Sequence, residues 1–428
     1  MTELSRRTLL RGTAAAAAVA ASTTVRADDR PIPKAPAKGP IEDGKPIRIG
    51  FIGLGGMGNG HLDSTLGQIK DGKVNAQVVA VAEVQKFRRE DAQKKATERQ
   101  TGVEVAAYVD YLELLARPDI DCVLIASPEH WHAQMAVDAI QNGKDVYLEK
   151  PMTLRLADAL WLERVMAANP HMRLQVGTQY MMWGRYREAK RLIAEGAIGH
   201  PTFSQTSYCR NNKEGEWLYG IDDRVAPGET LDWKRWCGPL GEQKWDTNIY
   251  HRWRRYKDFS TGIIGDLLVH MMTPMIYAVD PGWPVRVSAI GGHYHDKAMQ
   301  NHDQVNLAVQ FEKEHTMIVA GSTCNEQGLE AMVRGHEGNL YLGSNNCVLR
   351  PERLYADEID QQEIKCDPIS EQPELRRNWL DCVRSREANV SPVELGAKVM
   401  VIVDLATRAM WEGGEWLFDP ATRTARRA

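Results

Sequence analysis

Two patterns of apolar residues alternate along the first part of the chain. Short, nearly continuous apolar runs are typical of strands buried on both faces, and segments with a helical period are typical of the helices that cover them. Strands are predicted at residues 47–52, 77–83, 103–109, 121–126, 145–149 and 172–178, and helices at 59–68, 86–100, 111–116, 132–142 and 153–168. This alternation predicts a parallel, doubly wound α/β sheet.

The pattern changes after about residue 180. A helix is predicted at 185–195 and a strand at 202–209, followed by an irregular segment, 210–258, that carries five tryptophans. Long irregular insertions usually line a site or cover a neighbouring subunit. Alternating runs without intervening helices follow at 285–291, 304–311, 316–321, 330–335 and 339–342, and two helices, 373–384 and 392–410, are expected to close the chain. The second part is therefore predicted to be an α+β domain with an open, mostly antiparallel sheet.

The chain is long enough for two domains. It has 428 residues, of which 43% are hydrophobic and 26% charged, an ordinary balance for a globular protein. We expect a signal peptide at 1–27, a Pro-, Lys- and Gly-rich linker at 28–45, a first domain at 46–180 and a second at 181–428. The C-terminal helices are expected to be able to pack back on the first domain.

The N-terminus has the pattern of a twin-arginine export signal. Arg6 and Arg7 precede an apolar run from Thr13 to Ser22, and Ala27 ends a small-x-small cleavage site. The apolar run is well short of the roughly 20 residues that span a bilayer, which disfavours a membrane anchor. The sequence therefore predicts a periplasmic or secreted protein that uses the twin-arginine export machinery.

Charge and cysteine content exclude several classes of protein. Cleavage after Ala27 would remove four arginines and one glutamate, which changes the formal net charge from −4 to −7. An acidic protein is not expected to bind nucleic acid or an anionic membrane surface. The seven cysteines are scattered without a C-x-x-C pair, so no disulfide framework or metal site is predicted.

A glycine motif follows the first predicted strand. Gly53, Gly55 and Gly58 match G-x-G-x-x-G between a strand and a helix, and Glu83 ends the next strand. The glycines permit a tight turn and a close approach to a pyrophosphate, while the acid binds ribose hydroxyls. The first domain is therefore predicted to be a Rossmann domain that binds NAD. Lys86 and Arg88 lie nearby, so NADP stays an alternative.

Three residues further along form a candidate catalytic group. Lys150 follows the fifth predicted strand, and Asp266 and His270 are four residues apart, on one face of a predicted helix that begins near Gly262. A fixed ammonium, a carboxylate and an imidazole suit alcohol oxidation by hydride transfer. Alternatively, Asp266 caps the helix and His270 is a core histidine.

G-x-G-x-x-G, Glu149-Lys150-Pro151 and the spacing G-x-x-x-D-x-x-x-H together resemble the Gfo/Idh/MocA family of oxidoreductases, from about residue 46 to the end. The resemblance implies that Lys150, Asp266 and His270 are catalytic, and that the second domain's exposed sheet face makes homo-oligomers. The family often has a further acid where this chain has Thr273.

The remaining candidates lie around the expected cleft. Predicted cofactor-binding residues are Gly53, Gly55, Met57, Gly58, Glu83, Ser127, His132, Glu149, Lys150 and Gln179, and predicted substrate residues are Tyr180, Trp253 and Arg254. An aromatic face and a guanidinium suit a sugar-like ring, although a packed tryptophan and a surface arginine are the alternative. His130 and His132 have no third ligand nearby, so no metal is expected.

The sequence therefore predicts an NAD(P)-dependent oxidoreductase that acts on a secondary alcohol of a sugar, sugar derivative or cyclic polyol. Because an exported enzyme meets no free nicotinamide pool, we expect a tightly bound cofactor. One alternative is an NAD-dependent glycosidase that works by transient ring oxidation and elimination. An alternative from another class is a non-catalytic sugar or nucleotide sensor.

Overall fold

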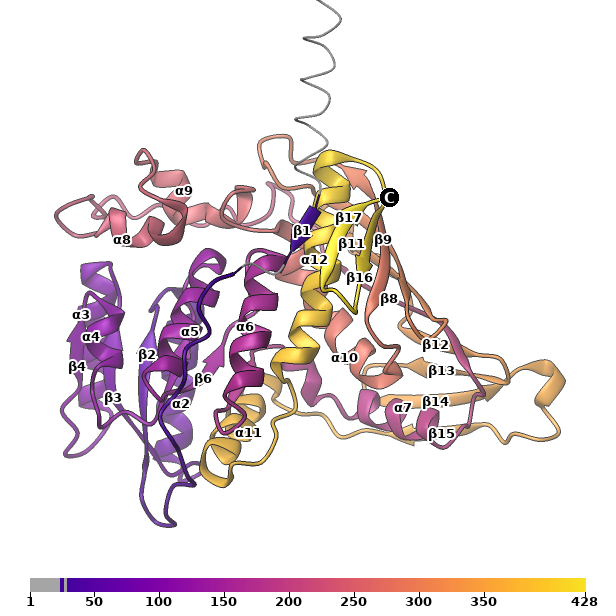
Figure 1. Cartoon of the computed structure of the whole chain (residues 1–428), viewed down its shortest axis with the longest axis horizontal. Coiled ribbons are helices and arrows are strands. Elements are labelled where there is room, and N and C mark those ends of the chain that lie inside the picture. Colours follow the sequence, from indigo (N-terminus) through magenta and orange to yellow (C-terminus); the bar gives the residue numbers. More distant parts are fainter. Residues whose placement is uncertain (1–23, 27–28) are drawn as a thin grey trace, which may run out of the picture.

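The computed structural model describes residues 24–26 and 29–428. Two sheets lie side by side, each with its own helices, and the C-terminal helix Val393–Glu412 (α12) runs between them (Figure 1). Helix Glu371–Ser385 (α11) packs against Gly56–Lys70 (α2) and Asp145–Leu148 (β6) of the first domain.

The first sheet is parallel and six-stranded, in the order β4-β3-β2-β5-β6-β7. Its strands are Ile47–Ile52 (β2), Ala76–Ala82 (β3), Ala106–Tyr108 (β4), Cys122–Ile125 (β5), Asp145–Leu148 (β6) and Leu174–Val176 (β7). Its helices are Gly56–Lys70 (α2), Lys86–Glu98 (α3), Tyr111–Leu115 (α4), His132–Gln141 (α5) and Leu156–Ala168 (α6). The strand order reverses between β2 and β5, and ligands of such sheets bind beyond the carboxyl ends of the strands at this point.

The second sheet is mixed and has 11 strands, in the order β1-β17-β16-β9-β10-β11-β8-β12-β13-β14-β15. They are Thr24–Arg26 (β1), Pro201–Cys209 (β8), Pro284–Gly292 (β9), Gln304–Phe311 (β10), Thr316–Ser322 (β11), Met332–Gly335 (β12), Gly338–Leu342 (β13), Asn346–Pro351 (β14), Gln362–Lys365 (β15), Trp416–Asp419 (β16) and Thr424–Arg427 (β17). The pairing is antiparallel except between β8 and β11. Helices Gly184–Ala194 (α7), Val269–Val279 (α10), Glu371–Ser385 (α11) and Val393–Glu412 (α12) complete the fold.

The second sheet has one covered face. Helices α7, α10 and α12 pack against its strands, and residues of β10 alternate between buried positions and more exposed ones. This alternation is typical of an antiparallel sheet with its other face in solvent.

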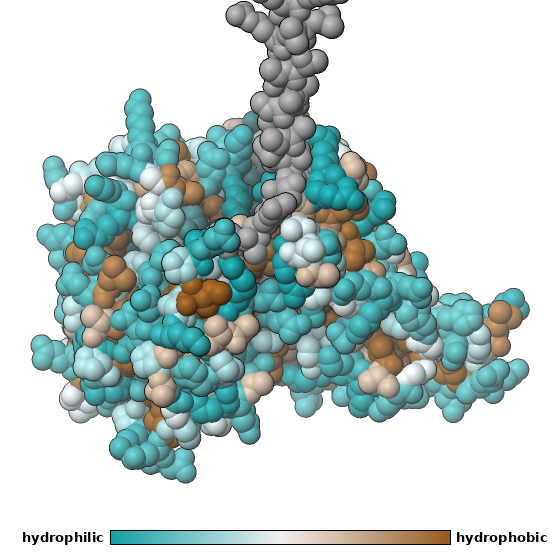
Figure 2. Space-filling view, viewed as in Figure 1, coloured by the Kyte–Doolittle hydropathy of each residue, from teal (hydrophilic) through white to brown (hydrophobic). Residues whose placement is uncertain are grey.

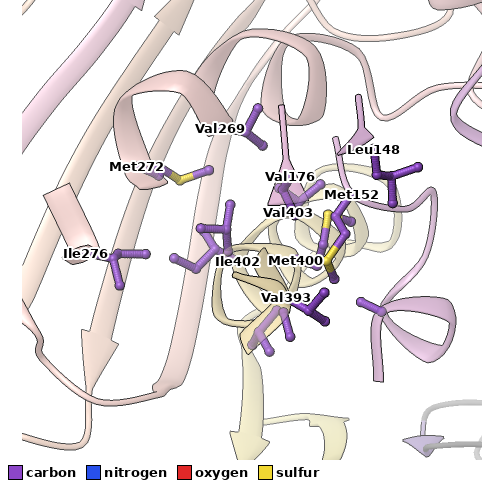
Figure 3. Packing of buried hydrophobic residues seen from close by; sticks show 14 of the residues in the cluster. Leu148, Met152, Val176, Val269, Met272, Ile276, Val393, Met400, Ile402 and Val403 are labelled. Atoms are coloured by element: carbon purple, nitrogen blue, oxygen red, sulfur yellow. The ribbon is translucent and has the colours of Figure 1, made fainter. Parts of the chain in front are cut away.

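Helix α12 joins the two halves into one hydrophobic core. Its Met400 lies beside Met152 and Val176 of the first domain, while its Ile402 lies on the side of α10, toward Ile276 (Figure 3). All of these side chains are at most 3% exposed. Because the removal of apolar area from water drives association, the shared core holds the two sheets in a fixed relation.

Residues 210–258, here called the tryptophan-rich segment, are more regular than expected. They include short helices, Trp233–Cys237 (α8) and Thr247–Arg252 (α9), and lie across the first sheet's helices near α3 and α4 (Figure 1). A small separate core is formed with Phe259 by five residues of the segment: Leu231, Trp233, Trp236, Cys237 and Tyr250. Lys86 N donates to Thr230 O at 2.8 Å, and Asp232 N donates to Val84 O at 3.2 Å. The segment is thus attached to the strand and helix that follow the glycine turn.

The expectation that two helices close the chain is wrong. The hairpin β16–β17 follows α12, and β14 and β15 extend the second sheet beyond the last predicted strand. Strand β15 is mostly exposed, and β17 contains two consecutive arginines. Charged strands near a sheet edge lack the buried alternation by which strands are recognised.

The predicted linker lies against the first domain. Residues 29–45 form no helix or strand, but Trp161 Nε1 donates to Pro31 O at 2.9 Å. Lys38 Nζ lies 2.9 Å from the buried carboxylate of Asp145, and Asn169 donates to Pro33 O. These contacts hold the segment along α6 and β6.

The predicted export signal lies almost wholly outside the described residues. Of it, only Thr24–Arg26 is described, as β1 paired antiparallel with β17. In the described part of the chain no helix is both long and apolar enough to span a bilayer. Hydrophilic residues cover most of the face in Figure 2. All seven cysteines are unpaired, and four of them are buried.

Candidate active site

A cavity of about 700 Å³ lies between the carboxyl ends of the first sheet and the tryptophan-rich segment. Predicted site residues that line it are Gly53, Gly55, Met57, Glu83, Ser127, His132, Glu149, Lys150, Trp253 and Arg254. The tryptophan-rich segment contributes Tyr219, Gly220, Arg235, Trp236, Tyr250 and His251. The fold thus brings most of the predicted cofactor and substrate residues to one cavity.

The glycine turn has the geometry that a bound pyrophosphate requires. Gly53 has a φ of +83°, and a Cβ there would lie 2.7 Å from Ser127 N. A Cβ on Gly58 would lie 1.9 Å from Gly53 O. The nearest atom to a Cβ on Gly55 is Arg88 Nη1 at 3.7 Å. The first and third glycines are therefore obligatory for packing, and the second leaves the turn open to the cavity.

The start of helix α2 has the features of an anion site. Its N-cap, Gly55, offers no side-chain hydrogen bond, and its first turn has no acidic residue. The free N–H groups and the helix dipole attract a phosphate. Ser127 Oγ and Tyr250 OH are buried without a hydrogen-bond partner in the described structure, and both residues line the cavity. These groups fit a dinucleotide, whose phosphates and hydroxyls would satisfy them.

Glu83 and Arg88 form the wall next to the glycine turn. The Glu83 carboxylate accepts hydrogen bonds from Leu54 N at 2.7 Å and Gln85 N at 3.0 Å. These bonds fix its position and leave lone pairs for ribose hydroxyls. The Arg88 guanidinium lies 5.4 Å from the centre of the Tyr250 ring. The acid disfavours the additional phosphate of NADP, whereas Arg88 would attract it.

Lys150 and Asp266 form a buried ion pair between the two domains. Lys150 Nζ lies 3.0 Å from Asp266 Oδ1, and each side chain is 8% exposed. Arg254 Nε donates to the same oxygen at 2.9 Å. Burial alone would raise the pKa of Asp266, but Lys150 and Arg254 outweigh it and hold that pKa well below its usual range. One carboxylate therefore holds two cations whose side chains line the cavity.

His270 lies further along the same segment, beneath two tyrosines. Its ring centre is 5.2 Å from that of Tyr180 and 6.2 Å from that of Tyr208. Its Nδ1 is buried and has no hydrogen-bond partner in the described residues. Burial and the charge of Lys150 lower the pKa of His270 to about 3. The imidazole is therefore neutral at neutral pH and has the lone pair that a proton acceptor needs.

The predicted helix that carries Asp266 and His270 is present over residues 262–279, but it is not a uniform α-helix. Asp266 lies in a π-helical turn, Ile264–Leu268, and α10 begins only after it. A Cβ on Gly265 would lie 1.8 Å from Thr261 Oγ1, so the turn needs glycine there. Such wide turns often occur at functional sites.

Five predicted residues do not line the cavity. Besides Asp266 and His270, they include Gln179, whose Oε1 accepts a hydrogen bond from Gln372 Nε2 of α11 at 3.0 Å. Tyr180 is the fourth, and its ring stacks on Trp183 with centres 3.7 Å apart. Their direct roles toward a ligand stay predictions. The third glycine, Gly58, also lies outside the lining because it packs against the turn.

His132 joins two parts of the cavity wall. Its Nε2 lies 2.9 Å from Ser127 O, and its Nδ1 lies 2.7 Å from Pro151 O. The ring therefore ties the loop after β5 to the loop after β6. At the other side, Trp253 supports the Arg254 guanidinium, which lies 4.2 Å from its ring centre.

Sequence reasoning missed a buried chain of polar groups behind Glu149. Glu149 Oε1 lies 2.7 Å from His61 Nε2, and His61 Nδ1 lies 2.7 Å from Arg376 Nη1 of α11. A guanidinium only donates, so Nδ1 must accept and Nε2 must donate to the carboxylate. No sequence signal relates His61 to Arg376, because 315 positions separate them.

Among the residues with described positions, no group of three or more His, Cys, Asp or Glu could hold a metal ion. His130 Nε2 instead lies 2.9 Å from Trp236 O.

Comparison with known families accounts for both domains. Residues 47–178 match an oxidoreductase family described as an NAD-binding Rossmann fold. Residues 184–426 match the C-terminal alpha/beta domain of the same family. The cofactor predicted from the glycine turn, NAD, is confirmed by the first match.

Curated relatives include inositol 2-dehydrogenases. That of Burkholderia lata is 30% identical over 207 residues, which is 48% of this chain and 58% of the relative. Inositol 2-dehydrogenase 1 of Saccharopolyspora erythraea is 31% identical over 155 residues, 36% of this chain and 43% of the relative. The chain thus matches about half the length of these relatives.

Solved structures confirm the predicted fold class. Levoglucosan dehydrogenase in complex with NADH superposes with a TM-score of 0.64 at 18% identity, covering 87% of this chain and 98% of that one. An oxidoreductase from Thermotoga maritima gives a TM-score of 0.65 at 16% identity, covering 89% and 98%. At such identities the likeness shows the fold alone. On the strength of the two family matches, this chain belongs to the Gfo/Idh/MocA family of oxidoreductases.

Proposed function

We propose that this protein is an NAD-dependent dehydrogenase that oxidises a secondary alcohol of a sugar, sugar derivative or cyclic polyol. The observation that carries the proposal is that the Lys150 ammonium, held by Asp266, lines the same cavity as the glycine turn. A fixed cation beside a nicotinamide site is placed to stabilise the negative charge that develops on an alcohol oxygen.

Each member of the group has a separate task. Lys150 stabilises the developing alkoxide, and His270, neutral and with a free nitrogen, takes the hydroxyl proton. Asp266 fixes the positions of Lys150 and Arg254. Bound NAD supplies the hydride acceptor.

The substrate side of the cavity suits a polyhydroxylated ring. Trp253 offers an aromatic face, and Arg254 uses its Nε on Asp266, which leaves its two terminal amino groups to donate to neighbouring hydroxyls. The inositol 2-dehydrogenase names of the sequence relatives and the levoglucosan dehydrogenase name of a structural neighbour support this substrate class.

The direct test is to purify the protein, identify any co-purifying nucleotide by mass spectrometry, and then add sugars and polyols, including myo-inositol and levoglucosan. We expect the absorbance of reduced nicotinamide to increase when one of these compounds is added. Release of nitrophenol from a nitrophenyl glycoside without added nucleotide and without net absorbance change at that band would favour the glycosidase instead. If the protein bound no nucleotide and catalysed no reaction, the result would favour the non-catalytic sensor.

We further propose that the cofactor is tightly held, since the tryptophan-rich segment closes the cavity opposite the glycine turn. The export signal in the sequence supports a periplasmic or secreted location. The solvent-facing side of the second sheet is the surface proposed for a homo-oligomer. Detection of a mature N-terminus at Asp28 in the periplasm, and of the oligomer by light scattering, tests these two points.

The hydroxyl of Tyr250 provides a specific test of nucleotide binding. We expect Tyr250→Phe to weaken NADH binding about tenfold, because one buried hydrogen bond to the nucleotide is lost. Titration of NADH fluorescence measures the effect. Tyr186→Phe is the matched control, since Tyr186 OH is also buried without a partner in the described residues but is not in the cavity lining. Equal affinities of both variants would contradict the assignment.

A further inference from the structure

A single short turn of the first domain contacts two separate parts of the second. The 3₁₀ turn Glu129–Trp131 follows β5 and leads into α5. Glu129 and His130 are buried, with exposed fractions of 1% and 7%. Neither residue's side chain is needed for the turn itself, so their contacts explain why polar groups are buried there.

Glu129 binds the loop from which the π-helical turn starts. Its Oε1 accepts from Ser260 Oγ at 2.6 Å. Its Oε2 accepts from Thr261 N at 3.1 Å and from Thr261 Oγ1 at 3.2 Å. All three donors precede Gly262, whose φ of +60° turns the chain into the π-helical turn. Three hydrogen bonds to one buried carboxylate fix this loop more firmly than neutral contacts would.

Thr261 passes this constraint on to the ion pair. Its Oγ1 occupies the space that a Cβ on Gly265 would need, at 1.8 Å, and Gly265 directly precedes Asp266. Pro151, which follows Lys150, also lies close, because Pro151 Cγ would be 3.4 Å from the same Cβ. The position of Thr261 therefore determines how closely the π-helical turn approaches the loop that carries Lys150.

The same turn holds the cover of the cavity. His130 Nε2 and Trp131 Nε1 each lie 2.9 Å from Trp236 O, and the Trp131 ring fills the space beside Gly238. The three consecutive residues Glu129, His130 and Trp131 thus hold the tryptophan-rich segment and the loop before Gly262 in fixed positions relative to the first domain.

We propose that Glu129 is a positioning residue that sets the Asp266 turn against Lys150 and so determines the geometry of the ion pair. Its role in turnover rests on the dehydrogenase activity proposed above, whereas its structural role does not.

The charges around Glu129 make its proposed positioning role depend on pH. Burial raises the pKa of Glu129 to about 7, and the charge of Asp266 adds to this rise while that of Arg254 opposes it. The pKa of Asp266 is held far below this range, and that of Arg254 is raised. Burial lowers the pKa of His130 to about 4 and that of His270 to about 3. Glu129 is therefore the member of this set that changes charge near neutrality.

Protonation weakens the attachment. The Ser260 hydroxyl can turn to accept the proton of the neutral acid, but it then no longer donates to Glu129. The two bonds from Thr261 then go to a neutral carbonyl oxygen, which is a weaker acceptor than a carboxylate, and the Asp266 turn is less well fixed. We expect kcat to fall as the pH falls through about 7.

The test compares Glu129→Gln with the wild-type protein in two measurements. Amide hydrogen exchange of residues 261–268 is expected to be faster in the variant, in the absence of any substrate. With the sugar found in the panel, kcat is expected to fall at least about tenfold, while the NADH dissociation constant and KM change little. The variant's kcat should also lose the inflection near pH 7, because an amide does not titrate.

Asp145→Asn is the matched control. Asp145 is a fully buried carboxylate that contacts Lys38 and Arg386 at the amino end of β6, the opposite edge of the sheet from the cavity. Its replacement should alter exchange near β6 and α11 but not in residues 261–268. Unchanged exchange of 261–268 in Glu129→Gln, or a retained inflection, would overturn the inference. If no sugar is oxidised, the proposed function fails, and the exchange comparison alone decides the role of Glu129.

Discussion

Replacing Lys150 by methionine is expected to lower kcat by about 100- to 1,000-fold, the usual cost of removing one group that stabilises charge in a transition state. Methionine keeps the length and apolar stem of the side chain, so the cavity wall stays filled. The NADH dissociation constant should change by less than about threefold, because the pyrophosphate and ribose groups bind elsewhere. Steady-state kinetics with the sugar found in the panel and NADH titration measure the two quantities.

Lys144→Met is the control for the loss of a buried lysine. Lys144 is 5% exposed, and its Nζ donates to Arg117 O and Ile120 O, just before β6. Its replacement should reduce stability but leave kcat within about twofold of wild type, as expected for a site remote from the reaction. An equal loss of kcat in both variants would show that Lys150 acts through the fold.

Replacing Asp266 by alanine is expected to lower the free energy of unfolding by about 3 kcal/mol, because it leaves the charges of Lys150 and Arg254 buried without their counter-ion. Urea denaturation followed by tryptophan fluorescence measures this. The folded-state pKa of Asp266 is lowered, so its stabilisation is present above the unfolded value of about 3.9 and is lost only as the pH falls through the lower folded value. The difference between variant and wild type should therefore be constant around neutrality.

An exposed acid offers the comparison. Asp222 pairs with Arg224 at 2.7 Å, but the two side chains are 36% and 67% exposed. Asp222→Ala should change stability by less than about 0.5 kcal/mol, because water replaces the lost contact. If Asp266→Ala were as mild, the carboxylate would not be holding its two cations in place.

Local sequence patterns were sufficient to predict the strands and the glycine turn of the first domain. Except for β4, its strands are short and almost wholly buried, so their apolar runs are distinct. A spacing rule captures the positive φ of Gly53 and the contact of Gly58 with Gly53 O, because both are local. The same holds for Lys150, which follows the end of a recognisable strand. In the second domain, the strands near the sheet edge were not predicted from the sequence, because their residues are exposed to water and carry charge.

The sequence by itself determined the parallel sheet and the glycine turn, and it predicted Lys150, Asp266 and His270 as a group. Only the tertiary structure decided that Asp266 lies in a π-helical turn, that the tryptophan-rich segment covers the cavity, and that Glu129 fixes the loop before Gly262. The physical reason is the range of the contacts. Periodicity and turn chemistry act within a few residues, whereas a buried carboxylate finds its donors wherever the packed chain brings them, here 131 positions away.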